Sequence, residues 1–107
     1  MVRDQIVALV ACPVDSAERF AETLVQNRLA ACINIVPRVV SVYRWKGVVH
    51  KDDEALMILK TSQSRLAEIE QCLAGIHPNE VFELISFPIT GGAQNYLDWI
   101  LSETGVE

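Results

Sequence analysis

Apolar residues along this chain form either short continuous runs or stripes at helical spacing. Residues 6–12 are an unbroken apolar run with several β-branched residues, which predicts a strand covered on both faces. After Pro13, the acidic residues Asp15 and Glu18 mark a helix start. The stripe that follows comprises Ala17, Phe20, Ala21, Leu24 and Val25. The pattern therefore predicts a helix that ends near Arg28, where a cation suits the helix dipole.

Residues 31–61 have the pattern of one long β-hairpin around Gly47. Both arms are rich in β-branched and aromatic residues, and a polar patch at 51–54 interrupts the second arm. Pro37 cannot donate to a sheet ladder, so it predicts a bulge or a strand edge. Each arm has about 14–15 residues, whereas typical strands have about 5–6.

A second helix and a fourth strand follow the hairpin. Ser62 or Ser64 could cap the helix, and Pro78 ends it. Its apolar stripe is Leu66, Ile69, Leu73 and Ile76. Residues 81–88 predict a strand, and residues 95–102 predict a short terminal helix. The resulting β-α-β-β-α-β order predicts a single α+β domain over residues 1–107, with a ferredoxin-like sheet under two helices on one face.

The length of the hairpin suggests that the chain associates with other copies of itself. Two helices of three turns cannot cover arms of this length, and the overhang is apolar. Its apolar residues are Val39, Val40, Val42, Tyr43, Trp45, Val48 and Val49. We expect this overhang to pack against another copy of the chain. The alternative is that the hairpin bends at Pro37 and folds back over its own sheet.

Composition and charge exclude several classes of protein. The chain has 107 residues, 50% of them hydrophobic, and a net charge of −5. An acidic chain without a basic run is a poor partner for nucleic acid or an anionic membrane. The N-terminus lacks the pattern of a signal peptide, and no apolar run approaches the ~20 residues that span a bilayer. Three cysteines without zinc-ligand spacing are typical of a reducing compartment, and we expect the cytoplasm.

The candidate chemistry is sparse. No nucleophile–base motif, P-loop or dinucleotide fingerprint is present, which predicts a protein that is not an enzyme. His77 and Glu80 follow the second helix and could meet a ligand or cation, although His77 could equally cap the helix. Lys60 interrupts an apolar strand, so it is either paired or at the strand end in water. The three cysteines fit structural thiols in the interior.

Five segments together resemble a known family. They are residues 29–34 (LAACIN), 41–47 (SVYRWKG), 58–61 (ILKT), 77–81 (HPNEV) and 96–100 (YLDWI). In this order and spacing they resemble the CutA family of divalent-cation tolerance proteins, over nearly the whole chain. The resemblance implies a ferredoxin-like fold, a tight homotrimer similar in architecture to PII signalling proteins, a link to copper and other divalent metals, and no settled enzymatic activity.

The chain departs from the family at a proposed copper site. That site uses a cysteine of the first strand and a His-His pair before a proline. Here Leu9 takes the place of the cysteine and Ile76 that of the first histidine, so His77 alone is retained. No cofactor is required, and we expect weak binding of copper or zinc through His77 and Glu80.

Two functions therefore stand at this point. The first is a non-enzymatic homotrimer that binds a metal or small ligand in metal tolerance. The second is a PII-like signalling module that senses a small anionic ligand at clefts between subunits. The candidate cleft residues are Tyr43, Trp45, Lys60, His77 and Glu80. We expect a trimer to bring Tyr43 and Trp45 of one chain over the His77 region of the next.

Overall fold

The computed structural model describes residues 4–105 and has one sheet under two helices. The ends of the predicted domain, residues 1–3 and 106–107, lie outside the described residues. All three strand pairings are antiparallel, in the order β2-β3-β1-β4. The strands are β1 (Gln5–Cys12), β2 (Cys32–Trp45), β3 (Val48–Ser62) and β4 (Ile85–Pro88). The predicted ferredoxin-like topology is confirmed.

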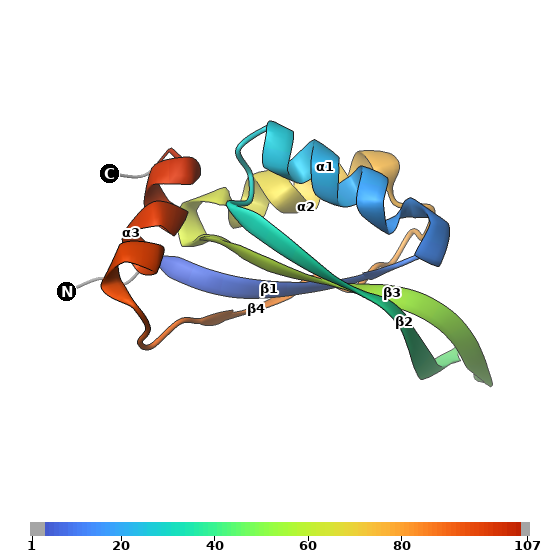
Figure 1. Cartoon of the computed structure of the whole chain (residues 1–107). Helices are drawn as coiled ribbons and strands as arrows, with labels where there is room; N and C mark the ends of the chain where they lie inside the picture. Colours follow the sequence, from blue (N-terminus) through green and yellow to red (C-terminus); the bar gives the residue numbers. More distant parts are fainter. Residues whose placement is uncertain (1–3, 106–107) are drawn as a thin grey trace.

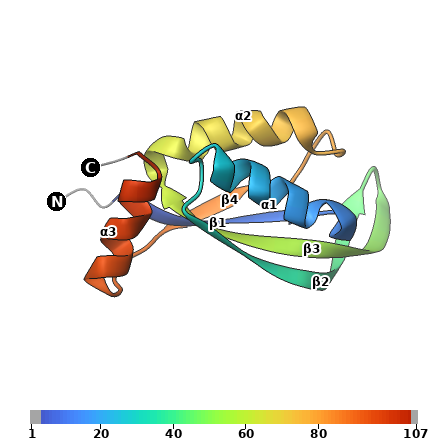
Figure 2. The same ribbon diagram turned by 45° about the horizontal axis from the view of Figure 1, so that its top comes forward.

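Three helices complete the fold: α1 (Ala17–Gln26), α2 (Leu66–Ile76) and α3 (Gln94–Glu103). Helices α1 and α2 lie side by side on one face of the sheet, and α3 lies at the end of the sheet away from the hairpin tip (Figures 1 and 2). The core fills the layer between the two helices and the sheet. Its largest fully buried side chains include Phe20, Leu24, Met57, Leu59, Ile69 and Leu73. The middle of each predicted apolar stripe therefore faces the sheet, whereas its last residue does not: Val25 is 40% exposed and Ile76 is 39% exposed.

The helix starts differ from the prediction. A short 3₁₀ turn precedes each of α1 and α2, at Val14–Ser16 and Gln63–Arg65, and neither helix has a side-chain cap. The hydroxyl of Ser62 bonds the hydroxyl of Thr104 instead, at 2.7 Å. Arg28 lies two residues beyond α1, and its guanidinium donates to carbonyl oxygens of α3.

The hairpin has the predicted length and the predicted irregularity. Its strands β2 and β3 have 14 and 15 residues. The register between them shifts from Val36 to Val39, around Pro37, which is the predicted bulge. Lys46 and Gly47 form the turn with φ of 50° and 81°, the left-handed conformations that two-residue hairpin turns require. Beyond the bulge the hairpin extends past the ends of α1 and α2 and is strongly curved (Figures 1 and 2).

The fourth strand is shorter than predicted. It covers Ile85–Pro88, not residues 81–88, because it pairs only with positions 6–9 of β1. The preceding residues leave the ladder: Val81 is 67% exposed, whereas Phe82 and Leu84 pack against the core. Packing of these two side chains overrides the strand propensity of the segment.

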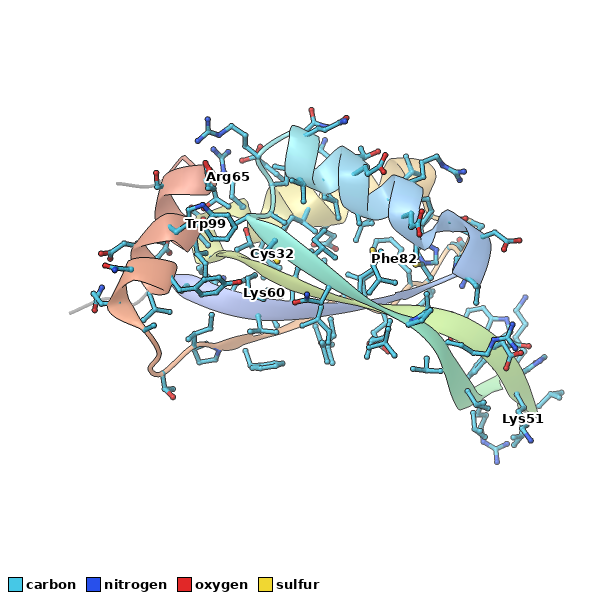
Figure 3. The ribbon with its side chains drawn as sticks, viewed as in Figure 1. Cys32, Lys51, Lys60, Arg65, Phe82 and Trp99 are labelled. Carbon is cyan, nitrogen blue, oxygen red and sulfur yellow. The ribbon has the colours of Figure 1, made fainter. Side chains whose placement is uncertain are left out.

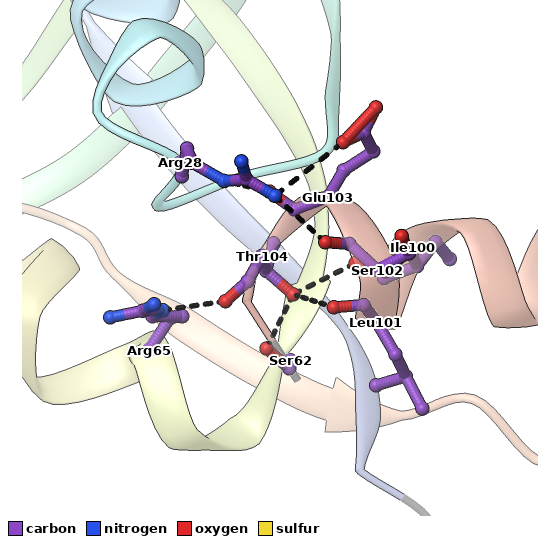
Figure 4. A network of polar contacts seen from close by, with 8 residues as sticks. All are labelled: Arg28, Ser62, Arg65, Ile100, Leu101, Ser102, Glu103 and Thr104. Carbon is purple, nitrogen blue, oxygen red and sulfur yellow. Dashed lines mark hydrogen bonds and ion pairs between the residues drawn. The ribbon is translucent and has the colours of Figure 1, made fainter. Parts of the chain in front are cut away.

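The C-terminal helix is held to the sheet by a polar network (Figure 4). The backbone carbonyl of Thr104 accepts a hydrogen bond from Nε of Arg65 at 2.8 Å, and the side chains of Ser62 and Thr104 are both fully buried. Arg28 donates to the carbonyl oxygens of Ser102 and Glu103 at 2.9 and 3.2 Å. These contacts join three segments that are far apart in the sequence.

The sheet face opposite the helices is apolar and partly exposed. Cross-strand pairs such as Leu9 with Ile58 and Leu9 with Ile85 lie on it, and Phe87 beside them is 47% exposed. No helix within residues 4–105 is long and apolar enough to cross a membrane.

Candidate functional site

A groove of about 970 Å³ lies between the outer half of the hairpin and residues 78–83, which connect α2 to β4. It brings together three of the five predicted cleft residues, Tyr43, Trp45 and Glu80, within one chain. The prediction had assigned the meeting of these segments to two different subunits. The curvature of the hairpin beyond its bulge explains the difference, because a bulge bends and twists the strand that carries it.

Aromatic side chains form part of the groove wall. Tyr43 and Trp45 are two residues apart on β2 and so lie on the same face of the strand, and Phe82 comes from the connection after α2. Trp45 is 43% exposed, and Nζ of Lys46 lies 5.9 Å from the centroid of its ring. The indole therefore already offers a face to an aliphatic ammonium group.

Tyr43 is held in place on two sides. Its ring stacks on His50 across the hairpin, with centroids 5.4 Å apart, and its hydroxyl donates a hydrogen bond to the carboxylate of Asp52. This hydrogen bond raises the pKa of Tyr43, because the carboxylate stabilises the protonated phenol; the charges of Asp52 and Glu54 act in the same direction. The ring is thus a fixed part of the wall.

The charge of the groove is strongly acidic. Five carboxylates line it: Asp52, Asp53, Glu54, Glu80 and Glu83. Within the part of the chain that the structure describes, no Lys or Arg lines the groove. Arg38 outside it reaches Asp53 at 3.7 Å. The electrostatics of this surface therefore favour a cation over an anion.

His77 lies behind the groove wall. It is 8% exposed and its ring stacks on Phe82, with centroids 5.1 Å apart, while Phe20 packs nearby. The backbone N–H of Asn79 donates to Nδ1 at 3.1 Å, so Nε2 carries the proton and donates to the carbonyl of Ala11 at 2.9 Å. Both ring nitrogens are engaged, and a metal ion could bind His77 only by displacing one of these hydrogen bonds.

Lys60 lies far from the groove. It is half-buried at the end of the sheet near α3, opposite the hairpin tip that Lys51 marks (Figure 3). Its ammonium donates to the side chain of Asn34, and its strand neighbours are Cys32 on β2 and Val7 on β1. Lys60 and the groove therefore do not meet within one chain.

The structure gives little support for a preformed metal centre. Within residues 4–105, no group of three or more His, Cys, Asp or Glu side chains lies close enough to hold a metal ion. Cys12 is buried, and Cys32 and Cys72 are half-buried, all as free thiols. Burial raises the pKa of Cys12 to about 11, with a smaller contribution from the charge of Glu54. A thiol in this state is a poor metal ligand near neutral pH, because the ligand form is the thiolate.

Sequence reasoning missed the acidic half of the groove. It treated residues 51–54 as a polar patch and gave no role to Phe82 or Glu83. The cross-strand register carried the missing signal: with the turn at Gly47, Asp52 pairs with Ser41, and Glu54 with Val39 after the bulge. Tyr43 pairs with His50, and Asp52 and Glu54 lie two and four residues beyond His50 on β3. Because every second residue of a strand lies on the same face, Asp52 and Glu54 share the face of the hairpin that carries Tyr43 and Trp45.

Comparison with known proteins identifies the family. The CutA1 divalent ion tolerance protein family matches residues 6–103. The chain belongs to this family. It is 43% identical over 100 residues to "Protein CutA, chloroplastic" of Arabidopsis thaliana, covering 92% of this chain and 55% of that protein. The chain spans 62% of the length of the Xenopus laevis CutA homologue.

Solved structures agree with the CutA1 assignment. The divalent cation tolerance protein CutA1 of Thermus thermophilus superimposes with a TM-score of 0.91 at 39% identity, covering 94% of this chain and 99% of that chain. The PII-like protein CutA of Nostoc sp. PCC 7120 superimposes with a TM-score of 0.86 at 30% identity, covering 92% and 96%. The resemblance stated from the sequence is confirmed, and a family of tolerance proteins agrees with the prediction of a non-enzymatic protein.

Proposed function

We propose that this CutA1 protein is a homotrimer that acts in divalent-cation tolerance by binding cations weakly in its acidic groove. The observation that carries the proposal is the conjunction of CutA1 family membership with a groove lined by five carboxylates. Carboxylate oxygens suit hard divalent cations, and an open arrangement of exposed carboxylates supports weak, water-mediated binding. No resident cofactor is part of the proposal.

Copper or zinc binding through His77 and Glu80 is the more specific form of this proposal. Copper and zinc accept imidazole nitrogen readily, but His77 would have to give up its bond to Ala11 or to Asn79. We therefore expect low affinity. Because a metal competes with protons for the imidazole, binding at His77 should weaken as the pH falls below about 6.

The assembly part of the proposal is supported by exposed apolar surface. Val40 and Val49 on the outer hairpin are 56% and 61% exposed, and Ile85 on the open sheet face is 55% exposed. Apolar surface on a hairpin and on an adjoining sheet face is typical of an interface between subunits. Strand β2 also lies at an edge of the sheet with free backbone groups for pairing.

Two measurements test the proposal. Light scattering on a sizing column should give about three times the chain mass of 11.9 kDa; a monomer at micromolar concentration contradicts the trimer. Calorimetry with copper and zinc should show weak binding to the native protein that decreases in Glu80→Gln and His77→Ala. Equal affinity in all three proteins removes both residues from the site.

A PII-like sensor of an anionic ligand is the second candidate function. The likeness to the PII-like protein of Nostoc favours it at the level of the fold. The carboxylates of the groove oppose it, since they repel an anion. A thermal-shift series with nucleotides beside the metals discriminates the two, because a ligand that binds the folded form raises the melting temperature.

The cytoplasmic location stays a proposal, supported by the three free cysteines.

A further inference from the structure

The carboxylates of the groove are spread out rather than gathered at one point. They come from both the hairpin and residues 80–83, around a space of about 970 Å³. Within the described residues no three potential ligands converge as a metal ion requires. Distributed negative charge is matched best by a ligand whose positive charges are also distributed.

Three of these carboxylates are available to a ligand. The other two already have partners within the chain. Asp52 accepts a hydrogen bond from the hydroxyl of Tyr43, and Asp53 forms an ion pair with Arg38. The other three carboxylates of the groove are those of Glu54, Glu80 and Glu83. Within residues 4–105 these three side chains form none of the ion pairs or side-chain hydrogen bonds found in the structure. Glu54 stands on the hairpin side of the groove and the other two on the opposite side, so a ligand that spans the groove can meet both.

The walls between the charges are apolar. The aromatic rings of Tyr43, Trp45 and Phe82 line the groove together with Pro13 and Pro78. Methylene groups pack favourably on such surfaces, and ammonium groups are attracted to aromatic faces. A hydrated inorganic ion would use none of this wall.

One aromatic residue of the groove wall, Trp45, already lies near an ammonium group, that of Lys46, which itself does not line the groove. The side chain of Lys46 is a primary ammonium on an aliphatic stem, and its Nζ lies 5.9 Å from the centroid of Trp45. An aliphatic amine in solution has the same chemistry. The groove volume also falls within the range of small-molecule sites, about 300–1,000 Å³.

We propose that the groove binds aliphatic polyamines, with ammonium groups on Glu54, Glu80 and Glu83 and methylene spacers on Tyr43, Trp45 and Phe82. This inference rests on the proposed role of the groove as a cation site and names a different preferred cation. It requires no covalent step and no cofactor. Its selectivity for an organic cation comes from the aromatic wall, and its affinity from separated carboxylates.

Calorimetry with spermidine on the assembled full-length protein at low salt tests the proposal. The double variant Glu80→Gln/Glu83→Gln should bind about tenfold more weakly, as expected for two exposed ion pairs. The matched control is Glu18→Gln/Glu22→Gln, which removes the same charge from exposed positions of α1 and should stay within about twofold of native. Glu54→Gln gives an independent variant on the other side of the groove.

The outcomes separate this inference from the proposed function. An equal loss in the α1 control, or Mg²⁺ binding as tightly as spermidine at equal ionic strength, indicates attraction by net charge alone and overturns the inference. Copper or zinc binding in the groove without spermidine binding also overturns it, and leaves the proposed function standing. Spermidine binding without any metal binding supports the inference and contradicts the metal-binding part of the proposed function.

Discussion

The ring of His77 ties the end of α2 to β1, because its Nε2 donates a hydrogen bond to the backbone carbonyl of Ala11 at 2.9 Å. The two residues are 66 positions apart in the sequence and both are buried. The same ring accepts a hydrogen bond from the backbone N–H of Asn79, which lies in the segment 78–83 that forms one side of the groove. His77 is therefore a positioning residue for the groove wall.

Replacement of His77 should destabilise the fold. His77→Ala leaves the carbonyl of Ala11 and the N–H of Asn79 without partners and opens a void beside Phe82, at a cost of about 2–4 kcal/mol. Urea unfolding measures the change. His50→Ala is the matched control, since the other histidine stacks only on Tyr43 at the exposed hairpin and should cost less than about 1 kcal/mol. Equal costs would contradict the assigned role.

The network that holds α3 gives a second prediction. Thr104→Val keeps the shape of the side chain but removes the hydroxyl that meets Ser62 at 2.7 Å in a fully buried position. The unpaired hydroxyl of Ser62 should cost about 1–2 kcal/mol. Thr23→Val serves as the control, because the hydroxyl of Thr23 bonds only Arg19 on an exposed face of α1. A Thr104→Val protein as stable as native would show that water replaces the bond.

Most of the fold follows from periodicity and from a few marked residues. The stripe from Ala17 to Val25 predicted α1, Pro37 predicted the bulge, and Gly47 predicted the turn. These features are local, so the residues involved carry their own signal. The early start given to the fourth strand was wrong because Phe82 and Leu84 pack on a core that the local sequence does not reveal.

The candidate site was harder to predict. Tyr43, Trp45 and Glu80 were identified, but the groove depends on how sharply the hairpin curves after its bulge, which sequence alone does not determine. The hydrogen-bond partners of His77 were likewise not predictable from the sequence. Its spacing from Pro78 and Glu80 suggested a ligand, whereas its hydrogen-bond acceptor lies on β1, far away in the chain.

The buried thiol of Cys12 gives a prediction of pH dependence. Its pKa is raised from 9.0 to about 11, chiefly by burial and then by the charge of Glu54. Folding therefore favours the protonated thiol: this contribution to stability is complete below pH 9 and is lost as the pH rises through 11. Unfolding free energies measured from pH 8 to 11 should fall less steeply in Cys12→Ala than in native protein.

Thiol labelling checks the same property by another route. At pH 8 a thiol reagent should modify the half-buried Cys32 and Cys72 before Cys12, which reacts only when the protein unfolds. Cys72→Ser is the control for both measurements and should leave the alkaline decrease in stability unchanged. Rapid labelling of Cys12 in the native protein would contradict its assignment as a protonated interior thiol.

The last prediction concerns the role of Trp45 in assembly. The indole is 43% exposed next to the hairpin turn, where the chain itself supplies little to cover it. If a neighbouring subunit covers it, truncation removes a large aromatic anchor, and Trp45→Ala should weaken the trimer by about 2 kcal/mol or more. Sedimentation over a dilution series measures the change. Trp99→Ala is the matched control, because Trp99 has a similar exposure of 40% but lies on α3 at the opposite end of the sheet (Figure 3). A Trp45→Ala protein that dissociates no more readily than Trp99→Ala would place Trp45 outside the interface and leave it as part of the groove wall alone.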